Sequence, residues 1–128
     1  MAKESWLVAW VGETDHKCAE GAILGQTGPI ASAIQQHVRF DRIHLLTNYS
    51  HERTERYCQW LEAQCPGSLV DLTDIDLTSP IDYADIYGKV VAELQQCRLP
   101  RDDVSLTFHL SPGTPAMAAI WIILAKTR

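Results

Sequence analysis

The stretch Val104–Leu124, VSLTFHLSPGTPAMAAIWIIL, holds the signals that decide the fold. Val104–Leu110 is rich in strand formers and too short for a typical helix. Ala116–Ala125 is apolar with helical spacing, so the pattern predicts a strand followed directly by a buried helix. In the connection Ser111–Pro115, glycine permits a tight turn, Thr114 can cap a helix, and proline suits its first position.

The rest of the chain repeats this order of strand and helix. Continuous apolar runs predict two buried strands, and alternating apolar and polar residues predict an edge strand; these lie at 6–11, 43–46 and 69–77. Amphipathic helices are expected at 29–38, at 51–64 with Ser50 as cap, and at 82–97. Residues 12–16 are interpreted as a polar loop, and most of 15–28 as loop or short helix.

Four strand–helix repeats predict a single α/β domain over residues 1–128, a Rossmann-like three-layer fold with a parallel sheet and helices on both faces. We expect the strand order 3-2-1-4, because it places the two most apolar strands, the first and the fourth, together at the centre. In such a sheet the ligand crevice lies at the carboxyl ends of the strands, where the strand order reverses. The loops 12–16 and 111–115 meet there.

The bulk composition limits the classes of function. A formal net charge of −5 argues against a general nucleic-acid-binding surface, and 46% hydrophobic with 21% charged residues is ordinary for a soluble globular protein. No apolar run reaches the length of a membrane span, and the amino terminus does not resemble a signal peptide. We therefore expect a cytoplasmic protein without membrane association.

The cysteines show no metal-binding spacing. They are well separated and form no CxxC pair: Cys18, Cys58, Cys65 and Cys97. Reduced thiols in a reducing compartment are therefore expected, with no metal and no other cofactor.

Neither crevice loop carries a P-loop or a dinucleotide fingerprint, which argues against a nucleoside triphosphate as the ligand. Glu13 and Asp15 would repel phosphate but can accept hydrogen bonds from ribose hydroxyls or an adenine amino group. The cationic candidates near the rim are Lys17, His51 and Arg53. The predicted cradle is therefore mostly backbone and hydroxyl groups, and it selects by shape more than by charge.

The histidines leave alternatives open. His16 follows the first strand and either reaches the crevice or belongs to a solvated loop; with Glu13 and Asp15 it could form an acid–base set, although nothing in the spacing singles that out. His109 lies within the fourth predicted strand and is interpreted as a core histidine.

The helix at 116–125 is too apolar to be solvated on any side. It needs the sheet on one side and another body, a further domain or a second copy, on the other. Tyr83 and Tyr87, one helical turn apart, are interpreted as core or interface residues.

At this level of detail the sequence resembles the CRISPR-associated Rossmann fold (CARF) domain, and most closely the amino-terminal sensor domain of RtcR-like regulators, which are sigma-54-dependent transcriptional activators associated with RNA repair. The resemblance covers most of the chain and rests on three motifs in order: FDRIHLL at 40–46, DLTSPIDYADIY at 76–87 and HLSPGTPAM at 109–117.

The resemblance implies a homodimeric sensor in which two copies share a pocket for cyclic oligoadenylate or, in the RtcR branch, for an RNA with a processed end such as a 2′,3′-cyclic phosphate. The ligand-binding positions carried over are Gly12, Glu13, Thr14, Thr47, Asn48, Ser111, Gly113 and Thr114. Pro112 and Pro115 flank the second loop and remove two backbone donors, which leaves fewer N–H groups for phosphate.

The leading hypothesis is a non-enzymatic sensor that controls an attached sigma-54-type activator, with the chain as the excised amino-terminal part of a longer regulator and no direct DNA binding by this domain. One alternative is a metal-independent ring nuclease that degrades cyclic oligoadenylate in CRISPR defence, for which His16, Glu13 and Thr114 are the candidate groups. Another is a dimerisation module without ligand.

Overall fold

The computed structural model describes residues 4–22, 25, 27–36, 40–77, 79, 81–99, 103–109 and 114–127. Its strands are β1 (Glu4–Trp10), β2 (Arg42–Thr47), β3 (Leu69–Asp74) and β4 (Val104–Phe108). Its helices are α1 (Glu13–Ala19), α2 (Pro29–Gln36), α3 (His51–Gln64), α4 (Tyr83–Gln96) and α5 (Pro115–Thr127). Among these residues, none of the helices is both long enough and apolar enough to cross a bilayer.

The four strands form one parallel sheet in the order β3-β2-β1-β4, which confirms the predicted order and the α/β Rossmann-like fold. The expectation that the first and fourth strands share the centre is wrong, because β4 lies at an edge of the sheet and the two inner strands are β2 and β1. Leu7 of β1 pairs with Ile43 of β2 and Thr107 of β4, so β1 is flanked on both sides. The edge strand β3 is only half-buried, as its alternating pattern predicts.

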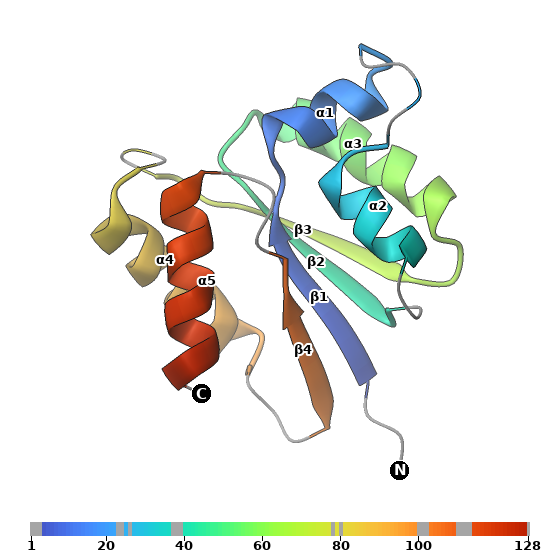
Figure 1. Cartoon of the computed structure of the whole chain (residues 1–128). Helices are drawn as coiled ribbons and strands as arrows, with labels where there is room; N and C mark the ends of the chain where they lie inside the picture. The colour runs from blue at the N-terminus through green and yellow to red at the C-terminus, as the bar shows by residue number, and fades with distance from the viewer. Residues whose placement is uncertain are drawn as a thin grey trace.

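Helices cover both faces of the sheet, which gives three layers (Figure 1). Alternate residues of β1 point to opposite faces. Trp6, Val8 and Trp10 pack with α4 and α5, whereas Leu7 and Ala9 pack with α2 and α3. α1 follows the carboxyl end of β1 and lies at that edge of the sheet.

Local signals at the helix starts behave as expected. Ser50 accepts a hydrogen bond from the Arg53 amide, and Asp82 accepts one from the Asp85 amide, so both cap their helices. At α5, the Thr114 hydroxyl accepts from the Met117 amide at 3.3 Å. Caps of this kind supply partners for the free N–H groups of a first helical turn.

The prediction of a polar loop at 12–16 is wrong. Glu13 begins α1, with Gly12 at the N-cap, and both Asp15 and His16 are buried. The buried carboxylate of Asp15 holds the first turn together by accepting from the Gly12 amide, an arrangement that hydrophobic periodicity does not reveal. The third and fourth strands also end earlier than predicted, at Asp74 and Phe108. The predicted helix position Val38 lies outside the described residues.

The outer surfaces of α4 and α5 carry exposed apolar side chains. Ile122 and Ile123 on α5 are 45% and 46% exposed, although Trp121 beside them is fully buried and stacks on Phe108. Tyr83 and Tyr87 are also exposed, which excludes the core alternative for both tyrosines. This surface is the one that the sequence predicts to need a second body.

Candidate functional site

Asp15 joins α1 to α2 in the interior at the carboxyl edge of the sheet. Its carboxylate accepts hydrogen bonds from the Gly12 amide at 2.9 Å and from the Ile30 amide at 3.0 Å. Burial raises the pKa of the Asp15 carboxyl, and the two backbone N–H groups oppose that rise. The amide of Ile30 belongs to the first turn of α2, so an internal carboxylate already occupies the N–H group that would attract an anion. The Asp15 carboxylate is therefore fully buried and bonded to the backbone of both helices, a structural role in place of the predicted polar loop position.

Two neighbours hold this junction in place. Gly28 has φ of +91°, and a Cβ there would lie 3.2 Å from both Cα and Oδ1 of Asp15. The two helices thus approach as closely as they do because residue 28 is glycine. His109 lies just beyond β4, half-buried, and its Nε2–H donates to the Pro29 carbonyl at 3.0 Å. The ring N–H of His109 therefore has a partner, but the interpretation as a core histidine within the strand is wrong, because the residue follows β4 and is only half-buried.

A pocket of about 530 Å³ lies beside this junction. Its lining includes Thr14 of α1, residues that precede α2 and residues of α2 itself: Gly25, Thr27, Gly28, Pro29, Ser32 and Gln35. The hydroxyls of Thr27 and Ser32 lie 3.2 Å apart. The described lining contains no ionised side chain, so this pocket can offer hydroxyl and amide groups to a polar ligand.

Arg53 of α3 bonds to two carboxylates, one at the start of α1 and one directly after its end. Its guanidinium donates two hydrogen bonds to Glu13, at 2.8 and 3.0 Å, and two to Glu20, at 2.7 and 3.0 Å. These hydrogen bonds from Arg53 hold the pKa values of both carboxyl groups below their ordinary range, and the two carboxylates raise the pKa of Arg53. Arg53 is consequently neutralised within the protein and not free for a phosphate.

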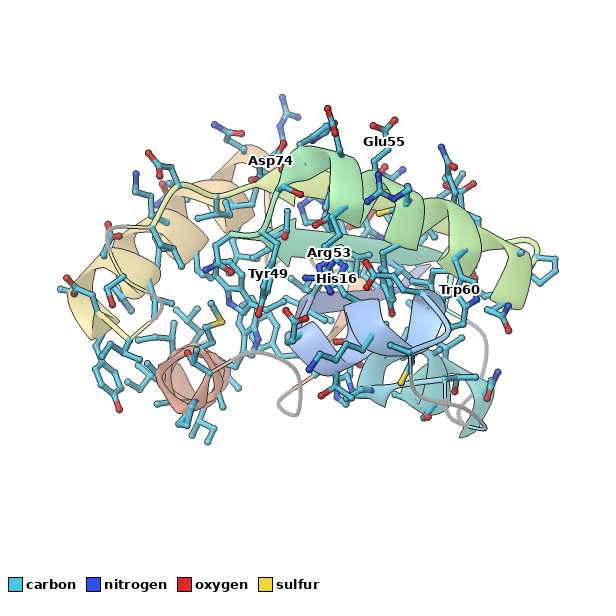
Figure 2. The ribbon with its side chains drawn as sticks, turned by 90° about the horizontal axis from the view of Figure 1, so that it is seen from above. His16, Tyr49, Arg53, Glu55, Trp60 and Asp74 are labelled. Carbon is cyan, nitrogen blue, oxygen red and sulfur yellow. The ribbon has the colours of Figure 1, made fainter. Side chains whose placement is uncertain are left out.

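His16 lies beneath this network. Its ring meets those of Tyr49 and Tyr57 edge-on, with centroids 5.0 and 5.7 Å away, and Nε2 lies 3.4 Å from the Thr54 hydroxyl. Figure 2 shows His16 and Arg53 between α1 and α3. Burial, followed by the charge of Arg53, lowers the pKa of His16, so the imidazole is neutral at pH 7. Only 1% of His16 is exposed.

Thr47 belongs to the same interior network. Its hydroxyl lies 3.0 Å from the Thr54 hydroxyl and accepts from the Tyr49 amide at 3.0 Å. The residue is 1% exposed. Thr47 therefore organises the turn between β2 and α3 and offers no accessible hydroxyl. Its neighbour Asn48 is half-buried on the same turn.

A smaller pocket, of about 270 Å³, lies between α1 and α3. It is lined by His16, Ala19, Glu20, Arg53, Arg56 and Tyr57. Arg56 is exposed at its rim, and burial raises the pKa of the Tyr57 hydroxyl. This pocket combines cationic and aromatic groups, whereas the larger one is lined by hydroxyls and backbone.

The predicted site residues occupy different positions relative to the pockets. Thr14 is exposed and lines the larger pocket, Glu13 is bound to Arg53, and Gly12 is buried at the cap of α1. Thr114 is committed to capping α5. Ser111 and Gly113 lie outside the described residues.

Sequence reasoning missed the start of α2 as a pocket wall. Thr27, Gly28 and Ser32 surround Pro29, and the Thr-Gly-Pro order was a readable signal for a helix start with nearby hydroxyls. The helix start at Pro29 is predicted from the sequence, but the role of these hydroxyls is not, because the pocket exists only once α1 places Thr14 against them.

These features define a Rossmann-like domain with pockets at the carboxyl edge of its sheet. The family model RtcR, described as "Regulator of RNA terminal phosphate cyclase", matches residues 24–128. The chain therefore belongs to the RtcR family. No curated protein sequence matches it.

A similar fold occurs in a solved structure of Enterococcus italicus Csm6 bound to cyclic hexa-2'-fluoro-hexa-dAMP. The likeness has a TM-score of 0.79 at 12% sequence identity and covers 98% of this chain. This chain spans 31% of that Csm6 chain. The family match agrees with the predicted resemblance to RtcR-like regulators, and the solved structure shows that Csm6 contains the same fold.

Proposed function

We propose that this chain is the ligand-sensing domain of a regulator, that its ligand is a cyclic oligoadenylate or an oligonucleotide derived from a processed RNA end, and that ligand binding controls an attached sigma-54-type activator. The observation that carries the proposal is the hydroxyl-lined pocket at the carboxyl edge of an RtcR-family CARF fold, beside Thr14. The solved Csm6 structure, which shares the fold, holds a cyclic hexanucleotide analogue.

The pocket's chemistry suits a ligand recognised by shape. Hydroxyls of Thr14, Thr27 and Ser32 can bond to ribose or base edges without a strong cationic trap. Arg53 is already paired with Glu13 and Glu20, which agrees with a domain whose formal net charge is −5. Affinity would then depend on the fit of a defined oligonucleotide more than on its total charge.

The placement of the candidate catalytic groups favours binding over cleavage. His16 is buried with a lowered pKa, Glu13 is held by Arg53, and Thr114 caps α5. A ring nuclease needs groups that touch the scissile phosphate. None of these three has that freedom without rearrangement of the helices that hold it.

The proposal includes a homodimer formed through α4 and α5. Ile122, Ile123 and Tyr87 are each more than two-fifths exposed on these neighbouring helices. Covering such side chains with a second copy removes apolar area from water. A cytoplasmic location is also part of the proposal, since the four cysteines are free.

Calorimetric titration of the purified domain tests the ligand. Cyclic oligoadenylates of different ring size and RNA oligonucleotides ending in a 2′,3′-cyclic phosphate are compared with the same RNA ending in a 3′-hydroxyl. We expect one of the first two classes to bind and the 3′-hydroxyl RNA to bind at least about tenfold more weakly, a difference of about 1.4 kcal/mol. Absence of binding by every probe at tens of micromolar would overturn the proposal.

Matched variants locate the binding. Thr14→Val and Ser32→Ala each remove a pocket hydroxyl and are expected to weaken binding about fivefold, the effect of one hydrogen bond. Ser105→Ala removes an exposed hydroxyl near the start of β4, away from the pocket, and should leave the affinity unchanged. Equal effects at all three positions would place the ligand elsewhere. Linear product from labelled cyclic oligoadenylate would instead support the ring nuclease.

Sedimentation measures the dimer. Ile122→Glu places a charge on the exposed face of α5 and should shift the domain to monomer. The control is Gln59→Glu at an exposed position of α3, which should leave the sedimentation coefficient unchanged. A wild-type domain that is monomeric at high micromolar concentration would contradict this part of the proposal.

A further inference from the structure

A cluster of metal-ligating side chains lies between the sheet and α4, away from both pockets. His44 projects from β2 toward the face covered by α4 and α5, and Glu93 and Cys97 lie one turn apart on and just after α4. Nε2 of His44 is 3.6 Å from Oε1 of Glu93 and 3.9 Å from Sγ of Cys97. Sγ of Cys97 is 3.9 Å from Oε1 of Glu93.

The burial of this cluster calls for a compensating positive charge. His44 and Glu93 are only 6% and 8% exposed, and a carboxylate buried without a counterion is strongly destabilising. The nearby guanidinium of Arg42 is bonded to Asp71 at 2.9 Å, on the other side of the imidazole. A cation held among the three side chains would therefore compensate the buried carboxylate of Glu93, since the charge of Arg42 is already paired with Asp71.

We propose that His44, Glu93 and Cys97 bind one Zn²⁺ ion. Tetrahedral zinc with bonds of about 2.0–2.1 Å to nitrogen, 2.0–2.2 Å to oxygen and 2.3 Å to sulfur places its ligand atoms roughly 3.3–3.6 Å apart. The separations of 3.6 and 3.9 Å in the structure need only small side-chain movements to reach that geometry. Imidazole and thiolate ligands favour zinc over magnesium or calcium.

The charges balance at such a site. The Cys97 thiol loses its proton to solvent when the Zn–S bond forms, so Zn²⁺ with one thiolate and one carboxylate is neutral overall. A water molecule fills the fourth position. Nδ1 of His44 faces Oδ2 of Asp71 at 4.0 Å, the type of outer carboxylate that orients a zinc-bound histidine. The bound metal would tie the end of α4 to β2.

The test uses metal-free, reduced domain titrated with Co²⁺ and then Zn²⁺. We expect about one equivalent of Co²⁺ to bind, with a near-ultraviolet sulfur-to-cobalt band and tetrahedral visible bands that Zn²⁺ abolishes. Saturating Zn²⁺ should raise the Tm by about 5 °C or more. Absence of the sulfur band and of any Tm shift would overturn the proposal.

Three variants identify the ligands. Cys97→Ser should abolish the sulfur band and weaken Zn²⁺ binding at least about 100-fold, and Glu93→Gln should keep the band while weakening binding. Cys65→Ser, a buried cysteine that packs on the opposite face, is the matched control and should change neither. Loss of the band in Cys65→Ser, or its survival in Cys97→Ser, would overturn the assignment. If Cys97→Ser fails to fold, unchanged zinc affinity in Glu93→Gln still overturns it.

Discussion

Two regions around α1 use carboxylates in opposite ways. Between α1 and α2, the Asp15 carboxylate is fully buried and bonds to two backbone amides, and its pKa is raised by burial. Between α1 and α3, Glu13 and Glu20 are partly exposed and bond to Arg53, which lowers their pKa values. Acid residues two positions apart on one helix, Glu13 and Asp15, thus serve surface pairing and interior structure, depending on which neighbouring helix each one faces.

Removing the interior carboxylate should have the largest effect on stability. Asp15→Ala leaves the amides of Gly12 and Ile30 without their acceptor in a buried place, and we expect a loss of about 3 kcal/mol in the free energy of unfolding. Urea denaturation followed by circular dichroism measures it. A loss below about 1 kcal/mol would mean that water readily replaces the carboxylate, and the comparison would break down.

Placing a Cβ between α1 and α2 should lower the free energy of unfolding somewhat less. Gly28→Ala introduces a Cβ at 3.2 Å from Asp15, on a residue whose φ is +91°. We therefore expect a loss of about 2 kcal/mol in the free energy of unfolding. The matched control is Gly88→Ala at an exposed position of α4, where a Cβ would meet no other atom within 4 Å. That variant should gain up to about 1 kcal/mol from the helix propensity of alanine. Similar destabilisation by both substitutions would contradict the role of the close approach.

Removing the surface network should have a smaller effect. The Arg53 side chain is 24% exposed and its carboxylate partners are more than two-fifths exposed, so solvent screens the pairs. We expect Arg53→Gln to cost about 1 kcal/mol at low salt and less at 0.5 M NaCl. The measurement is urea denaturation at both salt concentrations, with Lys89→Gln at an exposed position of α4 as control. A loss equal to that of Asp15→Ala would remove the distinction between the two regions.

The smallest expected effect is a pH dependence of the difference in free energy of unfolding between wild type and Arg53→Gln. Glu13 and Glu20 have folded pKa values below their ordinary 4.5, so their stabilisation is present above pH 4.5 and is lost as the pH falls through the lower folded values. Stabilities of wild type and Arg53→Gln should therefore converge as the pH is lowered from 5 to 3. The raised pKa of Asp15 has the opposite sign, since it lowers stability as the pH rises through the window above 3.8. A gap between the two proteins that widens on acidification would contradict the assignment.

Local patterns predicted most of the fold. The bounds of α3 agree with the predicted 51–64, because Ser50 caps it and Pro66-Gly67 follows it. The site was predicted less completely. Thr14 lines a pocket formed with α2, which the sequence did not predict, whereas Thr47 is buried and Glu13 is paired with an arginine 40 residues away. Such pairing depends on how α1 and α3 cross, which short-range periodicity does not encode.

The α/β class and the helix caps follow from the sequence alone, because apolar periodicity, proline, glycine and capping hydroxyls act over a few residues. Only the tertiary structure decided which polar groups are buried together. Asp15 meets Ile30, and His44 meets Glu93 and Cys97, from elements far apart in the chain. Once solvent is excluded there, each polar group needs a partner, and the packed helices determine which one it finds.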